Sequence, residues 1–445
     1  MSAAALGPVR PDQLRDEVLE LARRLIALDT SNPPGAETAA AELLGSYLRA
    51  NGVESELCGP DPERLNLVAR VAGTGEGETL ALLAHTDVVP APREQWTVDP
   101  FEGVVRDGRL VGRGACDMKG ELAARAVALA AYARSGERPR GDVLLIAESD
   151  EERNTAGVGM SWLVRERADL SAGAAINEGG GSLYELADGR RVVPISVGEK
   201  RVSSIRVTVF GRSSHASVPD DSDNPLRHAA VATQRLLDAR AEAEASPALD
   251  RALAILAPSA PDLETAIVVA AGLHPGLTAT IPAAARLTVT PTGLATHEPS
   301  NVIPPSADIV CDVRALPAHD EDDVRRHVAR ALDGVGFGWE LDWLEPLEGG
   351  TESSLETPLY RAIEAWLETR LPGAALLPVV SSGFTDSHWV RSEWGTAAYG
   401  FAPVFATDQV EYARSMHGAD EAIAIDDLAE MAAFNLAMIT ALQRP

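Results

Sequence analysis

The sequence contains few cysteines and few lysines. Cys58, Cys116 and Cys311 are widely spaced, odd in number and never part of a C-x-x-C pair. This argues against a disulfide framework and against a thiolate zinc site, so we expect reduced thiols. Lysine occurs only at Lys119 and Lys200, although arginine is abundant, so these two positions stand out.

The sequence also lacks long apolar runs and an excess of positive charge. No apolar stretch approaches the ~18 residues of a membrane span. The amino terminus shows no basic start followed by an apolar segment, as a secretory signal would. The formal net charge of −27 disfavours binding to nucleic acid or to anionic lipid. We therefore expect a cytoplasmic protein that binds neither nucleic acid nor membranes.

With 445 residues, the chain is longer than one hydrophobic core usually supports, so two domains are expected. The first part alternates helical and strand-like segments, which is typical of an α/β fold. The pattern changes near Lys200, where strand-like segments of alternating polarity begin, and a loop at residues 316–318 marks a return. The sequence thus predicts an α/β domain of residues 1–199 and 317–445, with an inserted α+β domain of residues 200–316.

Individual elements follow from the apolar pattern, because helical spacing predicts helices and short apolar runs predict buried strands. The expected helices span residues 14–26, 37–50, 119–134, 224–237, 322–332, 357–370 and 425–442. The expected strands span residues 65–71, 79–84, 142–147, 174–177, 192–197, 202–210, 287–290, 307–314 and 396–401, with 192–197 and 202–210 resembling antiparallel strands. Residues 241–271 are rich in alanine and are left unassigned.

Three of the expected strands end in histidine or carboxylate residues. One ends in His85-Thr86-Asp87, another in four acids within residues 148–152, and a third in Glu178. In open α/β sheets, ligands bind beyond the carboxyl ends of the strands. Each motif alone also fits a hydrogen-bonded surface pair or a solvated acidic loop. Their repetition at three strand ends indicates a common polar pocket.

The residue types in this pocket suit divalent metal ions. Imidazole and carboxylate groups hold ions that activate water, and a pair of ions needs a shared carboxylate. Asp117 is a candidate for that bridge because its neighbouring glycines permit close backbone approach, although it also fits a simple turn. His85 would bind one ion, with Asp87 orienting its imidazole. Glu151 and Glu152 are adjacent and must point in different directions, so one can bind metal while the other transfers protons.

Eight motifs extend this interpretation along the chain. They are AHTDVVPA, WTVDPFEGVVRDGRLVGRGACDMKG, SDEER, NEGG, GRSSHASVP, SNVIPPSADIVCDVR, GFTDS and SMHGADE. In order and spacing they resemble the co-catalytic zinc amidohydrolases, which include carboxypeptidase G, aminoacylase, acetylornithine deacetylase and succinyl-diaminopimelate desuccinylase. The resemblance covers nearly the whole chain. It implies a zinc-exopeptidase-like catalytic domain with an inserted α+β domain that serves as a lid and forms a homodimer.

Carried over position by position, the resemblance implies two Zn²⁺ ions per chain, with Co²⁺ or Mn²⁺ as substitutes. His85 and Glu178 would bind one ion, and Glu152 and His417 would bind the other. Asp117 would bridge the two ions.

The resemblance also implies roles for residues that do not bind metal. Glu151 would be the general base, and Asp87 would orient the imidazole two residues before it. His215 of the inserted domain would reach the partner subunit's site and stabilise the oxyanion. Asn301 and Arg314 would hold the substrate's carboxylate or polar tail. The simpler interpretations are a capping histidine for His215 and an ordinary strand arginine for Arg314.

The sequence departs from the family pattern in three places. Arg201 stands where a glycine is frequent, Phe384 replaces a frequent glycine of the pocket loop, and residues 241–291 form a longer stretch, more like the carboxypeptidase S branch. These departures leave the substrate open. We expect hydrolysis of an amide bond next to a carboxylate in a small N-acyl amino acid or peptide. The alternatives are a dipeptidase or aminopeptidase of the same fold, and a non-catalytic binding protein on this scaffold.

Overall fold

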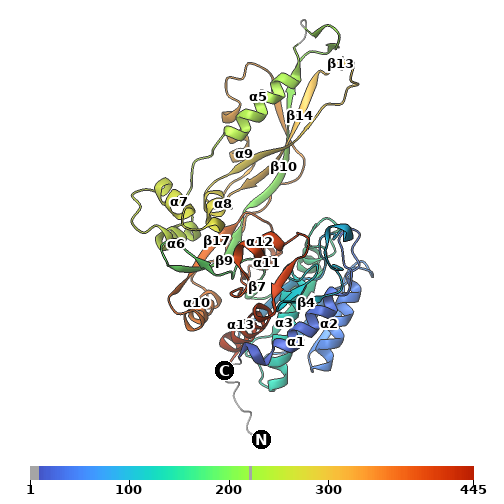
Figure 1. The fold of residues 1–445 in the computed structure, drawn as a ribbon, viewed down its shortest axis with the longest axis vertical. Coiled ribbons are helices and arrows are strands. Elements are labelled where there is room, and N and C mark those ends of the chain that lie inside the picture. Colours follow the sequence, from blue (N-terminus) through green and yellow to red (C-terminus); the bar gives the residue numbers. More distant parts are fainter. Residues whose placement is uncertain (1–9, 220–222, 445) are drawn as a thin grey trace.

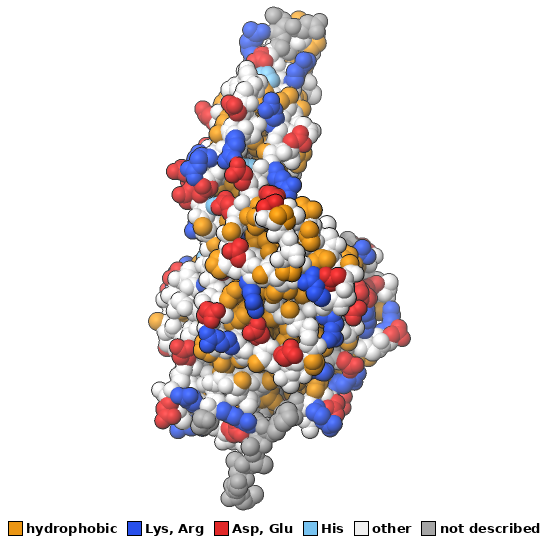
Figure 2. Space-filling view, turned by 90° about the vertical axis from the view of Figure 1, so that its left-hand side faces the viewer, with side chains coloured by type: hydrophobic (Ala, Val, Ile, Leu, Met, Phe, Trp, Pro, Cys, Tyr) orange, Lys and Arg blue, Asp and Glu red, His pale blue; other side chains and the backbone are white. Residues whose placement is uncertain are grey.

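The computed structural model describes residues 10–219 and 223–444. These residues form a large lobe and a narrower lobe that extends from it, each built on its own sheet (Figure 1). Acidic and basic side chains are interspersed over both lobes on the face that Figure 2 shows. Within the described ranges, no helix is both long and apolar enough to cross a membrane. The cytoplasmic location stays a prediction.

The large lobe contains a mixed sheet whose strands follow the order β1-β2-β6-β3-β7-β18-β9-β17, with β8 beside β9. Strand β3 runs parallel to both β6 and β7, as an α/β fold requires. The predicted fold class, an α/β unit with a second α+β unit, is confirmed. The strands are β1 (Glu54–Cys58), β2 (Asn66–Val71), β3 (Leu80–His85), β6 (Val143–Glu148), β7 (Ala174–Asn177), β8 (Tyr184–Glu185), β9 (Arg191–Glu199), β17 (Ala374–Ser381) and β18 (Ala397–Gly400).

Helices cover this sheet on both faces, which explains why its central strands are apolar throughout. In β3, Leu80, Leu82 and Ala84 pack towards one face, whereas Ala81 and Leu83 pack towards the other. The first face is covered by α1 (Arg15–Ile26), α2 (Thr38–Ala50), α3 (Lys119–Ser135), α10 (Pro358–Arg370) and α13 (Ile425–Gln443). The second is covered by α4 (Met160–Glu166) and α11 (Ser387–Trp394), and near β17 by α6 (Pro247–Leu256), α7 (Leu263–Ala271) and α8 (Pro275–Ala284).

The narrow lobe is an antiparallel sheet in the order β12-β14-β10-β15, with helices on one side. Alternate residues of β14 are buried and pack on α5 and α9, which is the pattern of a half-covered sheet. Its elements are β10 (Arg201–Phe210), α5 (Pro225–Asp238), β12 (Thr288–Ala295), β14 (Ser306–Ala315), α9 (Glu321–Ala331), β15 (Trp339–Trp343) and β16 (Glu348–Gly349). A short ladder of β11 (Ser214–His215) and β13 (Val302–Ile303) lies at its outer end (Figure 1).

The two sheets divide the chain at other residues than the domain limits that the sequence predicts. Those domain limits stay a prediction. Helices α6 to α8 lie within residues 200–316 but pack on β17 of the large lobe. Conversely, α9 and β15 follow residue 317 but belong to the narrow lobe, because β15 pairs with β10. Strand β10 is antiparallel to β14, as its sequence pattern predicts, whereas β9 runs parallel to β17 and antiparallel to β8.

The remaining elements connect these layers. A small sheet joins β4 (Val104–Arg106), β5 (Arg109–Val111) and β19 (Ala422–Ala424), and helix α12 (Gln409–Ser415) precedes β19 in the chain.

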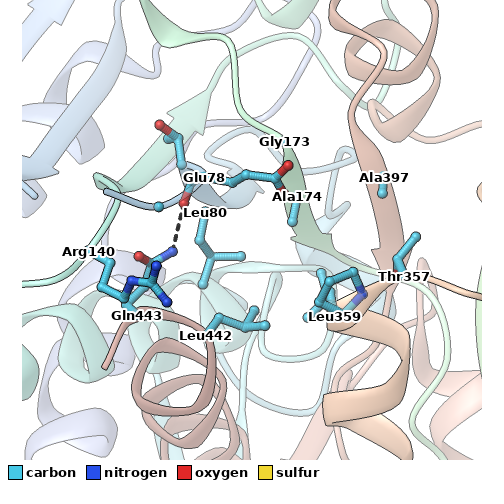
Figure 3. A pocket seen from close by; sticks show the side chains of 13 residues that line it. Glu78, Leu80, Arg140, Gly173, Ala174, Thr357, Leu359, Ala397, Leu442 and Gln443 are labelled. Carbon is cyan, nitrogen blue, oxygen red and sulfur yellow. Dashed lines mark hydrogen bonds between the residues drawn. The ribbon is translucent and has the colours of Figure 1, made fainter. Parts of the chain in front are cut away.

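A cavity of about 480 Å³ opens where β3 and β7 begin. Figure 3 shows that Leu80, Leu359 and Leu442 line it, while Gln443 Nε2 donates to the Glu78 carbonyl at 2.9 Å. This mainly apolar cavity lies at the edge of the sheet opposite the polar strand ends.

Candidate active site

The polar strand ends predicted from the sequence meet at one edge of the large sheet. His85 is the last residue of β3, Glu178 follows β7, and Glu151 and Glu152 follow β6. The strands are parallel neighbours, so their carboxyl ends project to the same side. Ligand atoms of His85, Glu151 and Glu178 lie within 4.8 Å of one another.

Asp117 lies at the centre of this group. Its Oδ1 is 3.1 Å from His85 Nε2, and its Oδ2 is 3.0 Å from His417 Nε2. His85 Nε2 is also 3.6 Å from Glu178 Oε2, and His417 Nε2 is 3.2 Å from Glu152 Oε2. The two carboxylate oxygens of Asp117 therefore face two different sets, each with one histidine and one glutamate.

The loop that carries Asp117, between β5 and α3, depends on small residues. Gly114 has φ +86°, a conformation that other residues rarely adopt. A Cβ atom on Gly120 would lie 2.2 Å from the carbonyl oxygen of Ala115. The glycines of the GRGACDMKG motif are thus required for the close packing that brings Asp117 to the strand ends.

Asp87 contacts both His85 and the acidic loop after β6. Its main-chain carbonyl lies 3.0 Å from His85 Nδ1, whereas its carboxylate is 3.6 Å away. The carboxylate accepts hydrogen bonds from the backbone N–H groups of Glu151 and Glu152, both at 3.2 Å. It also accepts from Asn32 Nδ2 at 2.9 Å. Asp87 therefore orients the imidazole mainly through its carbonyl, and its carboxylate holds the loop.

The site concentrates negative charge. Burial raises the pKa of Glu151 well above its usual range, and the neighbouring Glu178 raises it further. Burial also raises the pKa of Glu178. Hydrogen bonds to Asp117 and Glu152 raise the pKa of His417 to about 10. Such crowding is relieved when cations bind between the carboxylates.

The donor atoms fit divalent metal ions. Imidazole nitrogens and carboxylate oxygens are ligands for zinc and similar ions. Glu152 Oε1 is buried and has no hydrogen-bond partner within the described part of the chain, which suits an oxygen that coordinates a metal ion.

A cleft of about 640 Å³ connects these residues with the narrow lobe. Arg314, on β14, lines this cleft together with Asp117, Glu151, Glu152, Glu178 and His417. Its Nε donates to Asp312 at 3.0 Å, and its Nη1 donates to the carbonyl of Ser382 at 3.2 Å. The cleft therefore places a guanidinium opposite the candidate metal ligands.

The structure does not bring His215 and Asn301 into this cleft within one chain. His215 is on β11, and Asn301 precedes β13, at the outer end of the narrow lobe (Figure 1). There the Ala216 N–H donates to the Asn301 carbonyl at 3.0 Å. His215 Nδ1 lies 2.7 Å from Ser217 Oγ.

Several residues that shape the site were not predicted from the sequence. Asn32 links Asp87 to Asp150, whose Oδ1 accepts its amide at 3.0 Å. Arg113 and Glu421 form a buried ion pair at 2.7 Å behind Asp117 and His417. Arg113 and Glu421 lie inside the motifs GRGACDMKG and SMHGADE, so the signal was present, but nothing local to the sequence indicates their pairing.

Comparisons with known proteins identify the family of this chain. The profile of peptidase family M20/M25/M40 matches residues 81–441. A succinyl-diaminopimelate desuccinylase from Rhodospirillum centenum is 28% identical over 429 residues, covering 93% of this chain and 94% of the relative.

Two solved structures show the same fold at low identity. An M20 family metallo-carboxypeptidase from Sulfolobus solfataricus has a TM-score of 0.69 and 18% identity, covering 96% of this chain and 99% of its own. Human carnosine dipeptidase 1 has a TM-score of 0.65 and 17% identity, covering 97% of each chain. Because the family profile spans most of the sequence, the chain belongs to peptidase family M20/M25/M40 and is a metal-dependent hydrolytic enzyme.

Proposed function

We propose that the enzyme hydrolyses an amide bond next to a carboxylate, in a small N-acyl amino acid or peptide, with two Zn²⁺ ions per chain. The observation that carries this proposal is the position of Asp117 between two histidines, His85 and His417, that each have a glutamate beside them. The names of the relatives, a desuccinylase, a carboxypeptidase and a dipeptidase, favour a small amino-acid or peptide compound as substrate.

The distances support the following assignment. His85 and Glu178 would hold one ion, Glu152 and His417 would hold the other, and Asp117 would be shared between the two. Two divalent ions in these positions would polarise the substrate carbonyl and lower the pKa of the attacking water. Co²⁺ or Mn²⁺ would serve as substitutes because both accept the same donor atoms.

Glu151 is assigned as the general base. Its Oε2 is 4.0 Å from His85 Nε2, farther than the carboxylate oxygens assigned to the metals. It accepts the proton of the attacking water and returns it to the leaving amine nitrogen. Asp87 orients His85 and holds the main chain of Glu151, so that the base stays in reach of the reacting centre.

Substrate binding is assigned to both lobes and to a second subunit. Arg314 takes the substrate carboxylate through its planar guanidinium, which suits a carboxylate at the far side of the cleft. His215 and Asn301 lie too far out on the narrow lobe to serve their own chain's site and act in the site of the partner subunit. The exposed side chains of Leu226 and Leu237 on α5 support a homodimer through this lobe.

A dipeptidase or aminopeptidase of the same fold is the second candidate. Glu345 and Glu348 line the same cleft as Arg314, and a carboxylate there could bind the free amine of such a substrate. The third interpretation, a non-catalytic binding protein, is set aside because the family is one of hydrolytic enzymes.

Metal content and product analysis test the proposal together. The purified protein should contain close to two metals per chain by elemental analysis. It should cleave members of a panel of N-acyl amino acids, lose this activity on chelation and regain it with Zn²⁺. Faster cleavage of an unblocked dipeptide than of its N-acylated form would favour the second candidate, and failure to bind metal would refute both.

A further inference from the structure

A buried arginine and glutamate join the two loops that supply Asp117 and His417. Asp117 lies on the loop before α3, and His417 lies on the loop between α12 and β19, 300 residues later. Behind them, the side chains of Arg113 and Glu421 are 2% and 0% exposed. Arg113 Nη1 donates to Glu421 Oε2 at 2.7 Å. This pair joins the two loops through their side chains, beside the backbone ladder of β5 and β19.

The carboxylate of Glu421 is saturated with hydrogen bonds. Its Oε1 accepts from the backbone N–H groups of Cys116 at 2.6 Å and Asp117 at 3.0 Å. Its Oε2 accepts from the Gly114 N–H at 3.2 Å as well as from Arg113. Four donors correspond to the roughly four lone-pair positions of a carboxylate. The main chain that carries Asp117 is therefore fixed by one side chain from the other loop.

Arg113 extends this link to the histidine. Its Nη2 donates to the main-chain carbonyl of His417 at 3.2 Å. His417 has φ +60°, the left-handed region that a residue with a side chain rarely adopts. The guanidinium also lies over the ring of Trp96, 5.2 Å from its centroid. These contacts hold the His417 backbone in the conformation that brings Nε2 within 3.0 Å of Asp117 Oδ2.

We propose that Arg113 and Glu421 are positioning residues that set the spacing between Asp117 and His417, and thereby the affinity of the metal position that these two ligands share. The inference rests on the proposed function, because it assumes that both residues bind metal. Neither Arg113 nor Glu421 touches the substrate or supplies a ligand atom. They hold the two loops in a fixed relative position in the metal-free protein.

Two substitutions separate this role from simple support of the fold. Glu421→Gln keeps the shape, but its amide nitrogen must face one of the two donor pairs, so those donors lose their acceptor. Arg113→Lys keeps the charge, but a single ammonium replaces the planar fork that reaches two acceptors at once. Changes of this kind behind a metal ligand typically weaken metal binding by about 10- to 100-fold.

The experiment is a stepwise titration of the metal-free full-length protein with Co²⁺, monitored by calorimetry and by visible absorption. Glu430→Gln is the matched control, because it removes a buried carboxylate that pairs with Arg370 at 2.6 Å and lies outside the cleft. Circular dichroism confirms that each variant is folded. The wild type and the control should each bind two Co²⁺ ions, and the constant of each binding step should be similar in the two proteins.

In Glu421→Gln and Arg113→Lys, one of the two binding steps should weaken by about 10- to 100-fold. If Glu421→Gln does not fold, Arg113→Lys provides the same comparison. Wild-type constants for both steps in the folded variants would overturn the positioning role while leaving the proposed function intact. A wild-type protein that takes up no Co²⁺ would overturn both.

Discussion

Replacing Glu151 with glutamine tests whether this carboxylate transfers protons or binds metal. Its Oε2 lies 4.0 Å from His85 Nε2, whereas the nearest carboxylate oxygens of Glu178 and Asp117 lie at 3.6 and 3.1 Å. Glutamine has the same shape but cannot accept a proton at neutral pH, so the base is lost and the closer carboxylates remain. A positioned general base contributes roughly 10²- to 10⁴-fold, or about 3–5 kcal/mol of the activation barrier.

The assay measures kcat for one cleaved N-acyl amino acid together with metal content by elemental analysis. Glu151→Gln should lower kcat by roughly 10²- to 10⁴-fold and keep two metals per chain. Glu152→Gln is the contrasting variant, because its Oε2 lies 3.2 Å from His417 Nε2 and it should lose one metal. Loss of metal from Glu151→Gln, or activity close to that of the wild type, would refute the assignment of this residue as the base.

Three further predictions follow from other contacts. Asn32→Leu removes hydrogen bonds of 2.9 and 3.0 Å to two buried carboxylates, so it should lower the free energy of unfolding by roughly 2–4 kcal/mol in urea titrations; an unchanged midpoint would contradict this. If His215 serves the partner subunit, exchanging subunits between inactive His215→Ala and Glu151→Gln dimers should restore roughly a quarter of wild-type activity, since half of the dimers become hybrids with one complete site. No recovery after proven exchange would count against sharing. Burial lowers the pKa of Lys200 to about 8 from its usual 10.5. The unfolded chain then binds the extra proton between these values, so stability should rise from pH 8 to pH 10.5, and urea midpoints of Lys200→Met should lack this increase.

The central strands and the polar pocket could be predicted because their signals are local. All six residues of β3 are buried between two layers of helices, so the run before His85 is apolar without alternation. The residue that ends such a strand must then lie at the edge of the sheet. His85 and Glu178 were therefore identified from position alone, and Asp117 from the glycines around it.

Other parts depend on contacts between distant segments, which leave little local trace. His417 lies 300 residues from Asp117, and only the resemblance to a family connected them. Helices α6 and α7 lie in residues 241–271, the alanine-rich stretch for which the sequence pattern predicts no element. Their starts nevertheless carry capping signals, since Ser246 and Asp262 each accept a backbone N–H, and Ser246 precedes a proline at the first helical position.

The division into lobes was hard to predict for a similar reason. The chain enters the narrow lobe at β10, leaves it for α6 to α8, which pack on β17 of the large lobe, and returns at β12. It leaves the narrow lobe for the last time after β16, because β15 and β16 both pair with β10 across more than a hundred residues. The loop at residues 316–318 has the composition of a boundary, but pairing of the following strand decides where it lies. Local turn chemistry cannot report which of two sheets the next strand will join.

The candidate site combines crowded negative charge with many hydrogen bonds to Asp87 and Glu421, two carboxylates outside the proposed set of metal ligands. The carboxylate of Asp87 accepts three donors on one side of the site, and that of Glu421 accepts four on the other. Both are buried, so each bond offsets the loss of water around a charge. Asp87 fixes the loop of the proposed base, Glu151, and Glu421 fixes the loop of Asp117, the proposed bridging ligand. The proposed ligand atoms are thus positioned by hydrogen bonds that form on folding, and metal binding would not have to order the loops itself.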